Sequence, residues 1–150
     1  MRAVILVAAI AVTASPALGA VNNRDIRTTA ESYARATMAP DPTKSAAFCE
    51  AESTVVDEFA PHIWRGAGCA SWAKSFVAMS RQQGISACTA AVGAKGKVSV
   101  EGDVAYAVYP ATVSCMRQGK PFADHGLWTF VMHKGAAGWK IASWTWSTQP

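Results

Sequence analysis

The chain has 150 residues, the size of one domain with a short additional segment. Hydrophobic residues make up 51% of it and charged residues only 16%, a composition that can fill a core and that excludes a disordered chain. Fourteen Lys and Arg against ten Asp and Glu give a formal net charge of +4, too small and too scattered for a nucleic-acid-binding surface.

Residues 1–19 have the pattern of a signal peptide. Arg2 supplies a positive charge, the apolar stretch 3–14 follows, and small residues stand at 17 and 19 before a cleavage site. We expect cleavage after Gly19, with Ala20 as the near alternative, which leaves residues 20–150 as one domain. A retained anchor is the other interpretation, but this stretch is shorter than the roughly 18–20 apolar residues that cross a bilayer.

The leader therefore predicts an exported protein, periplasmic or secreted, with no membrane contact after cleavage. Its alanine-rich sequence and the absence of an Asn-X-Ser/Thr sequon favour a bacterial source.

The first half of the domain is predicted to be mainly helical. Apolar residues recur at helical spacing over 24–38. Asp41-Pro42 is typical of an N-cap followed by a proline in the first turn, so a short helix should run to about residue 49. Residues 53–64 predict an irregular strand broken at proline, and residues 69–83 predict a second amphipathic helix closed by glycine.

From residue 85 the apolar pattern changes to that of strands. Long strands are predicted over 87–100, 104–116, 122–134 and 139–147. Glu101-Gly102-Asp103 indicates a tight hairpin. The basic segment 93–97 lacks the spacing of a phosphate-binding loop, so we expect a bulge in a long strand. An antiparallel meander covered by helices predicts an α+β domain without an internal boundary.

Four cysteines in an exported chain predict two disulfides. If the hairpin turns at Glu101-Gly102, opposed residue numbers sum to about 203, and Cys88 faces Cys115 within reach of a cross-strand disulfide. Cys49 is then left to pair with Cys69. A loop one residue longer would offset the first pair, and free buried cysteines are the alternative to both bridges.

Three segments carry a resemblance to a known family. They are the strand DVAYAV at 103–108, the pair HGLWTFV at 125–131 and GWKIA at 138–142, and the strand TVVDEF at 54–59. Together with the order of elements they resemble the nuclear transport factor 2-like superfamily, which includes SnoaL-like cyclases and ketosteroid isomerases. The resemblance covers residues 24–147 and implies a cone in which a curved antiparallel sheet wraps the first helix around a pocket. It says less about function, because this fold hosts enzymes, ligand binders and assembly modules.

The resemblance also suggests catalytic candidates. In ketosteroid isomerase-like members a carboxylate on the first strand removes a proton next to a carbonyl, and a tyrosine on the first helix stabilises the oxyanion. Asp57 or Glu58 and Tyr33 stand at similar places here. A carboxylate in an apolar cavity has a raised pKa, which makes it a usable base. Since neighbours on a strand point to opposite faces, only one of the two carboxylates should enter the cavity. Alternatively, both are strand-edge charges and Tyr33 belongs to the core; a second acidic oxyanion donor has no counterpart that we can place.

His125 is a further candidate for proton transfer. It follows Asp124, but adjacent strand residues diverge, so we expect it to reach His62 or Asp57 across the cavity or to be structural. The three histidines lack the spacing of a zinc site, and no cofactor or metal is expected. Neither a G-x-S-x-G elbow nor an unpaired cysteine offers a nucleophile.

Six tryptophans are many for this length. Trp144 and Trp146 alternate onto one face of the last strand, where they could floor a pocket, form a dimer surface or pack the core. The candidate ligand-binding residues are Trp64, Tyr106, Trp128 and Trp144. We expect a non-covalent site for a small apolar or amphipathic molecule. The alternatives are a proton-transfer enzyme (isomerase, cyclase or dehydratase) and a homodimerisation or accessory module with a filled cavity.

Overall fold

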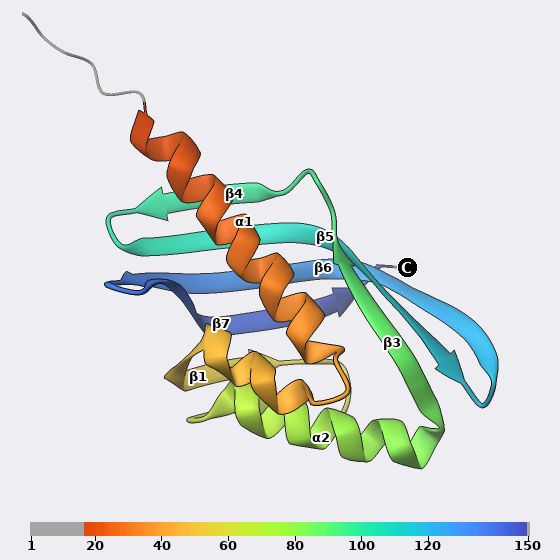
Figure 1. The fold of residues 1–150 in the computed structure, drawn as a ribbon. Coiled ribbons are helices and arrows are strands. Elements are labelled where there is room, and N and C mark those ends of the chain that lie inside the picture. Colours follow the sequence, from red (N-terminus) through yellow and green to blue (C-terminus); the bar gives the residue numbers. More distant parts are fainter. Residues whose placement is uncertain (1–16, 150) are drawn as a thin grey trace, which may run out of the picture.

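The computed structural model describes residues 17–149, with side chains from residue 23. Most of the predicted signal peptide, residues 1–16, therefore lies outside the described residues. The elements, shown in Figure 1, are α1 (Ala17–Thr37), the 3-10 helix η1 (Pro42–Phe48), β1 (Cys49–Val56), β2 (Ile63–Trp64), α2 (Gly68–Gln83), β3 (Ile85–Val92), β4 (Lys97–Glu101), β5 (Val104–Arg117), β6 (Lys120–Gly135) and β7 (Gly138–Thr148).

The strands form one curved sheet in the order β2-β1-β7-β6-β5-β3, with β4 also paired to β5. The predicted α+β cone is confirmed, but the sheet is mixed rather than antiparallel because β1 and β7 run parallel. Strands joined by tight turns must run antiparallel, whereas β1 and β7 are separated by most of the chain and carry no such constraint.

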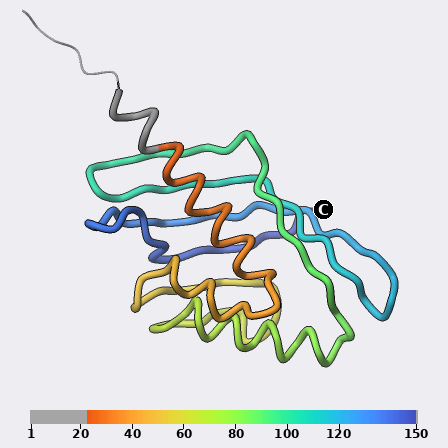
Figure 2. The backbone as a smooth tube through the Cα atoms, viewed as in Figure 1, coloured from red at the N-terminus to blue at the C-terminus, as the bar shows by residue number. Residues whose placement is uncertain are grey.

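Helix α1 crosses one face of the sheet, and α2 lies alongside the β1 end (Figures 1 and 2). The buried stripe of α1 follows the predicted helical spacing and comprises Ile26, Ala30, Tyr33, Ala34 and Thr37. The N-cap is confirmed, because Asp41 Oδ1 accepts a bond of 3.3 Å from the backbone N–H of Thr43. Gly84 ends α2 with φ of +65°, the left-handed conformation that suits glycine.

The predicted hairpin forms, but near the turn its strand register differs by two residues from the predicted register. Val100 pairs with Ala105 there, whereas Thr89 pairs with Ser114 as the predicted register requires. Residues 93–96 break the long predicted strand into β3 and β4 and absorb the difference, which fits the expected bulge.

Both predicted disulfides are present. Cys88 and Cys115 join β3 to β5 with Cα atoms 4.1 Å apart, and Cys49 and Cys69 join the start of β1 to α2.

The irregular strand predicted over 53–64 is interrupted earlier than expected. β1 ends at Val56, which pairs with Ile63 on β2, and the chain between them forms a turn with a cis Ala60–Pro61 bond. Asp57 and Glu58 therefore lie in this turn rather than on a strand. The strand rule that sends neighbours to opposite faces does not apply to them.

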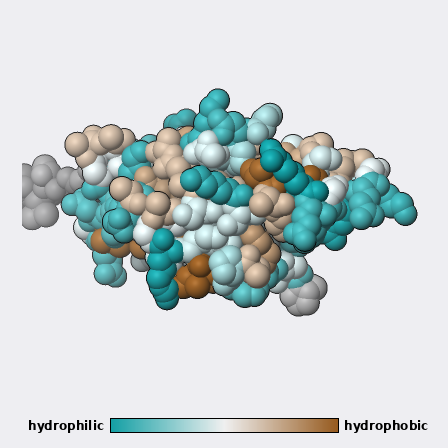
Figure 3. Space-filling view, turned by 90° about the horizontal axis from the view of Figure 1, so that it is seen from below, coloured by the Kyte–Doolittle hydropathy of each residue, from teal (hydrophilic) through white to brown (hydrophobic). Residues whose placement is uncertain are grey.

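Seen from below, the surface is mainly hydrophilic to intermediate, with hydrophobic residues in small separate areas (Figure 3). Over residues 17–149, no helix combines the length and the hydropathy needed to cross a membrane.

Candidate functional site

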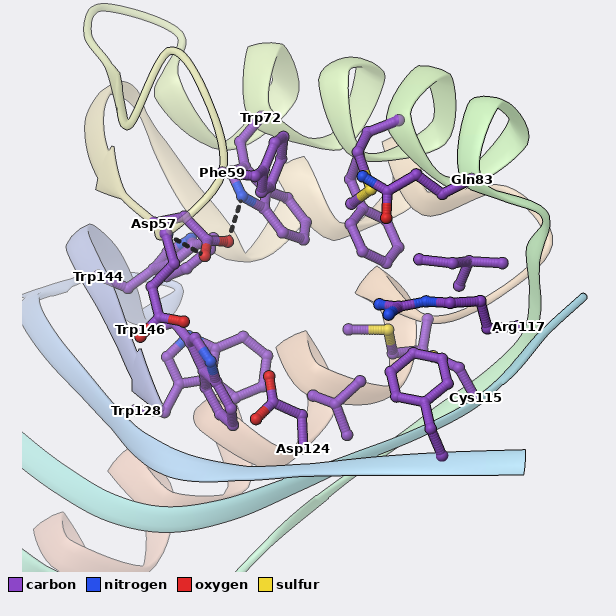
Figure 4. A pocket seen from close by; sticks show the side chains of 17 residues that line it. Asp57, Phe59, Trp72, Gln83, Cys115, Arg117, Asp124, Trp128, Trp144 and Trp146 are labelled. Carbon is purple, nitrogen blue, oxygen red and sulfur yellow. Dashed lines mark hydrogen bonds between the residues drawn. The ribbon is translucent and has the colours of Figure 1, made fainter. Parts of the chain in front are cut away.

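A cavity of about 260 Å³ opens between α2, the turn after β1, and the strands β5, β6 and β7 (Figure 4). Seventeen residues line it, and seven of them are aromatic. The aromatic residues are Phe59, Trp72, Phe76, Phe122, Trp128, Trp144 and Trp146. Such a lining, apolar with a few polar groups, is the usual character of a small-molecule site.

Asp57 is a partly buried carboxylate of the cavity. Its Oδ2 accepts a hydrogen bond of 2.7 Å from Trp72 Nε1, and its Oδ1 accepts one of 2.6 Å from the backbone N–H of Glu58. Burial raises the pKa of Asp57 to about 6, because loss of water outweighs these two donors, and the charges of Glu58 and Asp124 add to the rise. The group can therefore take up or release a proton near neutral pH.

Glu58 and Asp124 also line the cavity and share one partner. Glu58 accepts bonds from the backbone N–H of Thr148 at 2.5 Å and from its hydroxyl at 2.6 Å. Asp124 Oδ2 lies 3.3 Å from the same hydroxyl. The expectation that only one of Asp57 and Glu58 faces the cavity is wrong, because both stand in a turn.

Tyr33 does not line the cavity. Its ring is fully buried behind two cavity residues, with centroids 5.7 Å from Trp128 and 5.9 Å from Trp144. Burial raises the pKa of its hydroxyl above the ordinary value, and the hydroxyl has no hydrogen-bond partner among the described residues. The role of oxyanion donor therefore has no geometric basis for Tyr33, and the alternative of a core residue fits.

His125 is also outside the cavity. It is exposed, and its Nδ1 lies 3.0 Å from Thr112 Oγ1 on β5. Strand alternation on β6 sends its neighbour Asp124 into the cavity and His125 to the opposite face. The prediction that His125 reaches Asp57 or His62 across the cavity is wrong.

Of the four predicted ligand-binding residues, Trp128 and Trp144 line the cavity, and Trp64 and Tyr106 do not. Trp64 is buried and its Nε1 donates a bond of 3.0 Å to Ser75 on α2. Tyr106 is 47% exposed. It lies on the opposite face of β5 from buried Ala105 and Ala107, since side chains alternate along a strand.

The side of the cavity away from Asp57 carries a positive charge. Arg117 lies there in Figure 4, and its guanidinium sits 4.5 Å from the centre of the Phe122 ring. Gln83 from α2 and Cys115, which is disulfide-bonded, complete this side.

Sequence reasoning missed several lining residues, above all Trp72 and Arg117 as cavity groups, whereas Trp146 lines the cavity with Trp144, as one of the interpretations of the last strand expected. Trp72 belongs to the predicted apolar face of α2, but its bond to Asp57 depends on how α2 meets the turn after β1. The sequence could have predicted Asp124 as a cavity residue. Side chains alternate along β6, so Asp124 lies on the same face of the strand as Trp128. Within residues 17–149, no group of three His, Cys, Asp or Glu side chains is placed to hold a metal ion.

No protein-family model and no curated protein matches the sequence. Solved structures do match the fold. A nuclear transport factor 2-like superfamily protein from Salmonella enterica subsp. enterica serovar Typhimurium str. LT2 has a TM-score of 0.72 at 17% identity, over 88% of this chain and 94% of that one.

Two further solved structures agree. A nuclear transport factor 2-like protein with a cystatin-like fold from Novosphingobium aromaticivorans has a TM-score of 0.69 at 17% identity, over 86% of this chain and 82% of that one. A structure from Catenulispora acidiphila in complex with S-DNPA has a TM-score of 0.71 at 11% identity, over 86% and 94%. The chain therefore has the nuclear transport factor 2-like fold.

Proposed function

We propose that this protein binds a small amphipathic molecule non-covalently in the cavity beside Asp57. The observation that carries the proposal is an open cavity of about 260 Å³ with seven aromatic residues in its lining. Drug-sized pockets span roughly 300–1,000 Å³, so the ligand should be no larger than one or two rings. A structure of the same fold that is in complex with S-DNPA supports this use of the fold.

The accessory-module alternative requires a cavity plugged by the protein's own side chains. The cavity is open, so this alternative lacks its structural premise. Export is part of the proposal, and the two disulfides support it because such bridges persist in oxidising compartments.

Native mass spectrometry of the protein purified without reductant tests the binding proposal. We expect a mass excess that disappears on denaturation. Val113→Phe, which fills the cavity from β5, should abolish that excess. Val131→Phe is the matched control, because Val131 is a half-buried valine of β6 outside the cavity lining. A bare mass for the unmodified protein, together with no binding of small aromatic probes, contradicts the proposal.

Proton-transfer catalysis is the second candidate, and a specific observation favours it. Asp57 stands in an aromatic cavity with its pKa raised to about 6, close to the value suited to a general base. The captured molecule should then exchange a carbon-bound hydrogen for deuterium when the protein is incubated in heavy water. Asp57→Asn should abolish this exchange even when enough of the molecule is added to saturate the variant. Exchange that continues in the variant rules out Asp57 as the base.

A further inference from the structure

Four tryptophans line the same cavity with their ring planes at steep angles to one another. Trp72 meets Trp144 at 79° with ring centroids 4.9 Å apart, and Trp128 meets Trp144 at 76° and Trp146 at 86°. In this edge-to-face arrangement the edge of one ring packs against the face of the next, and Trp72 also stacks on Phe76 at 12°. A group bound in the cavity therefore contacts a wall of tryptophan rings rather than lying between them.

Hydrogen bonds hold two of these indoles in place. Trp72 Nε1 donates to Asp57 Oδ2, and Trp146 Nε1 donates to Thr148 Oγ1 at 3.2 Å. Trp128 and Trp144 are 2% and 1% exposed, so packing holds their rings. The aromatic surface is thus preorganised, and a ligand does not have to order it.

The same end of the cavity carries uncompensated negative charge. Asp57, Glu58 and Asp124 line it, and no ion pair reaches any of the three among residues 23–149. The Thr148 hydroxyl has a single proton, so it can bond only one of Glu58 and Asp124 at a time. The lining cation, Arg117, lies across the cavity over Phe122.

We propose that the end of the cavity formed by these tryptophans and carboxylates binds an organic cation, specifically an alkylated ammonium group. This inference rests on the proposed binding function and names the class of its ligand. Ammonium groups are attracted to indole faces, and the attraction strengthens when water is excluded. Nearby carboxylates add attraction that the low dielectric of the cavity increases.

The hydrogen-bonding pattern favours an alkylated group over a primary ammonium. A primary ammonium carries three donors that need acceptors. The oxygens of Asp57 and Glu58 each accept one bond and keep one acceptor site, but the indole rings that form the rest of this end offer no acceptor. A fully alkylated ammonium has no donor to satisfy and offers apolar surface to the rings.

Two probes of the same shape test the charge preference. They are para-hydroxyphenyl-trimethylammonium and para-tert-butylphenol, which differ in a positively charged nitrogen against a neutral carbon. At neutral pH, titration followed by tryptophan fluorescence and calorimetry should show the cation binding at least about tenfold more tightly, the range expected of desolvated cation–aromatic contacts. Equal or weaker binding of the cation overturns this inference and leaves the proposed binding function supported. Binding of neither probe overturns both.

Variants at the two ends of the cavity should act in opposite directions. Asp57→Asn should weaken binding of the cation about tenfold, and Arg117→Gln should strengthen it severalfold, with little change for para-tert-butylphenol. Arg117 is exposed, so its variant remains informative if Asp57→Asn fails to fold. Asp25→Asn and Arg65→Gln, both exposed and outside the cavity, are the matched controls. Equal effects of a variant on both probes contradict the inference.

Discussion

Asp57 is subject to opposing influences from its surroundings. Burial favours the protonated carboxyl, whereas the donors Trp72 Nε1 and Glu58 N–H favour the carboxylate. The pKa of Asp57 rises to about 6, so burial is the stronger influence. The folded protein therefore holds this proton more tightly than the unfolded chain, in which an aspartate has a pKa of about 3.9.

This difference predicts a pH-dependent stability. Between about pH 4 and pH 6 the folded state binds more protons than the unfolded state, so the free energy of unfolding falls as pH rises through this window. At 1.36 kcal/mol per pKa unit, the fall due to Asp57 is on the order of 3 kcal/mol. Asp57→Asn should remove it, as measured by urea denaturation at a series of pH values.

Asp25→Asn serves as the control, since Asp25 is exposed and should leave the slope unchanged. A slope in Asp57→Asn that equals that of the unmodified protein would show that other groups cause the pH dependence.

At this scale the sequence predicts part of the site. The resemblance to ketosteroid isomerase-like proteins suggests Asp57 or Glu58 as a cavity carboxylate, and both line the cavity. Tyr33 lies on the buried stripe of α1, but helical spacing cannot tell a residue that reaches a cavity from one behind its lining. The Trp72 partner of Asp57 comes from α2, and only the packing of α2 against the turn brings the two together.

At the scale of elements, the predicted hairpin contains two errors of strand register, one at the turn and one at residues 93–96, and they cancel before Cys88. The turn places Glu101 opposite Val104, which moves the register by two residues from the predicted one. The irregular segment 93–96 moves it back before Cys88, so the predicted Cys88–Cys115 pair forms. Glycines at 93 and 96 indicate an irregularity in the strand. The number of extra residues in it depends on contacts with β5, which cannot be read from the sequence.

Strand β6 offers a test of how closely the sheet packs beside the cavity. A Cβ on Gly126 would lie 2.5 Å from the Ser147 carbonyl oxygen and 2.7 Å from the Trp146 ring. Backbone oxygen cannot move aside easily, so Gly126→Ala should lower the free energy of unfolding by about 1–3 kcal/mol. It should also alter the near-ultraviolet circular dichroism of the tryptophans, because Trp146 must shift.

Gly135→Ala on the same strand is the matched control. The nearest atom to its Cβ would be the Gly138 carbonyl oxygen at 3.9 Å, an ordinary contact. Equal losses of stability in the two variants would show that strand propensity, rather than the contact with Trp146, sets the cost.

At the scale of the whole molecule, the two disulfides join different parts of the fold. Cys49–Cys69 ties α2 to β1, and Cys88–Cys115 ties neighbouring strands beside the cavity. The sequence separations of 20 and 27 residues are similar, so the chain-entropy argument assigns them similar stabilisation.

Replacing either cysteine pair by alanine should therefore lower the free energy of unfolding by about 2–4 kcal/mol, as measured by urea denaturation. Ligand retention in native mass spectrometry should fall further for the Cys88/Cys115 variant, because Cys115 lines the cavity and Cys49 does not. Equal retention in the two variants would show that the bridge does not shape the cavity.

The parallel pairing of β1 with β7 has a consequence for how the chain folds. Cys49 pairs with Ile141 and Val55 with Trp144, so these contacts join residues about 90 positions apart. A ribosome must therefore add about 90 further residues after β1 before β1 can pair with β7. Contacts of such high sequence separation slow folding, and the unpaired edge of β1 stays open to other chains in the meantime. A chain with this topology is therefore protected from mispairing if β1 is kept from other chains until β7 has been made.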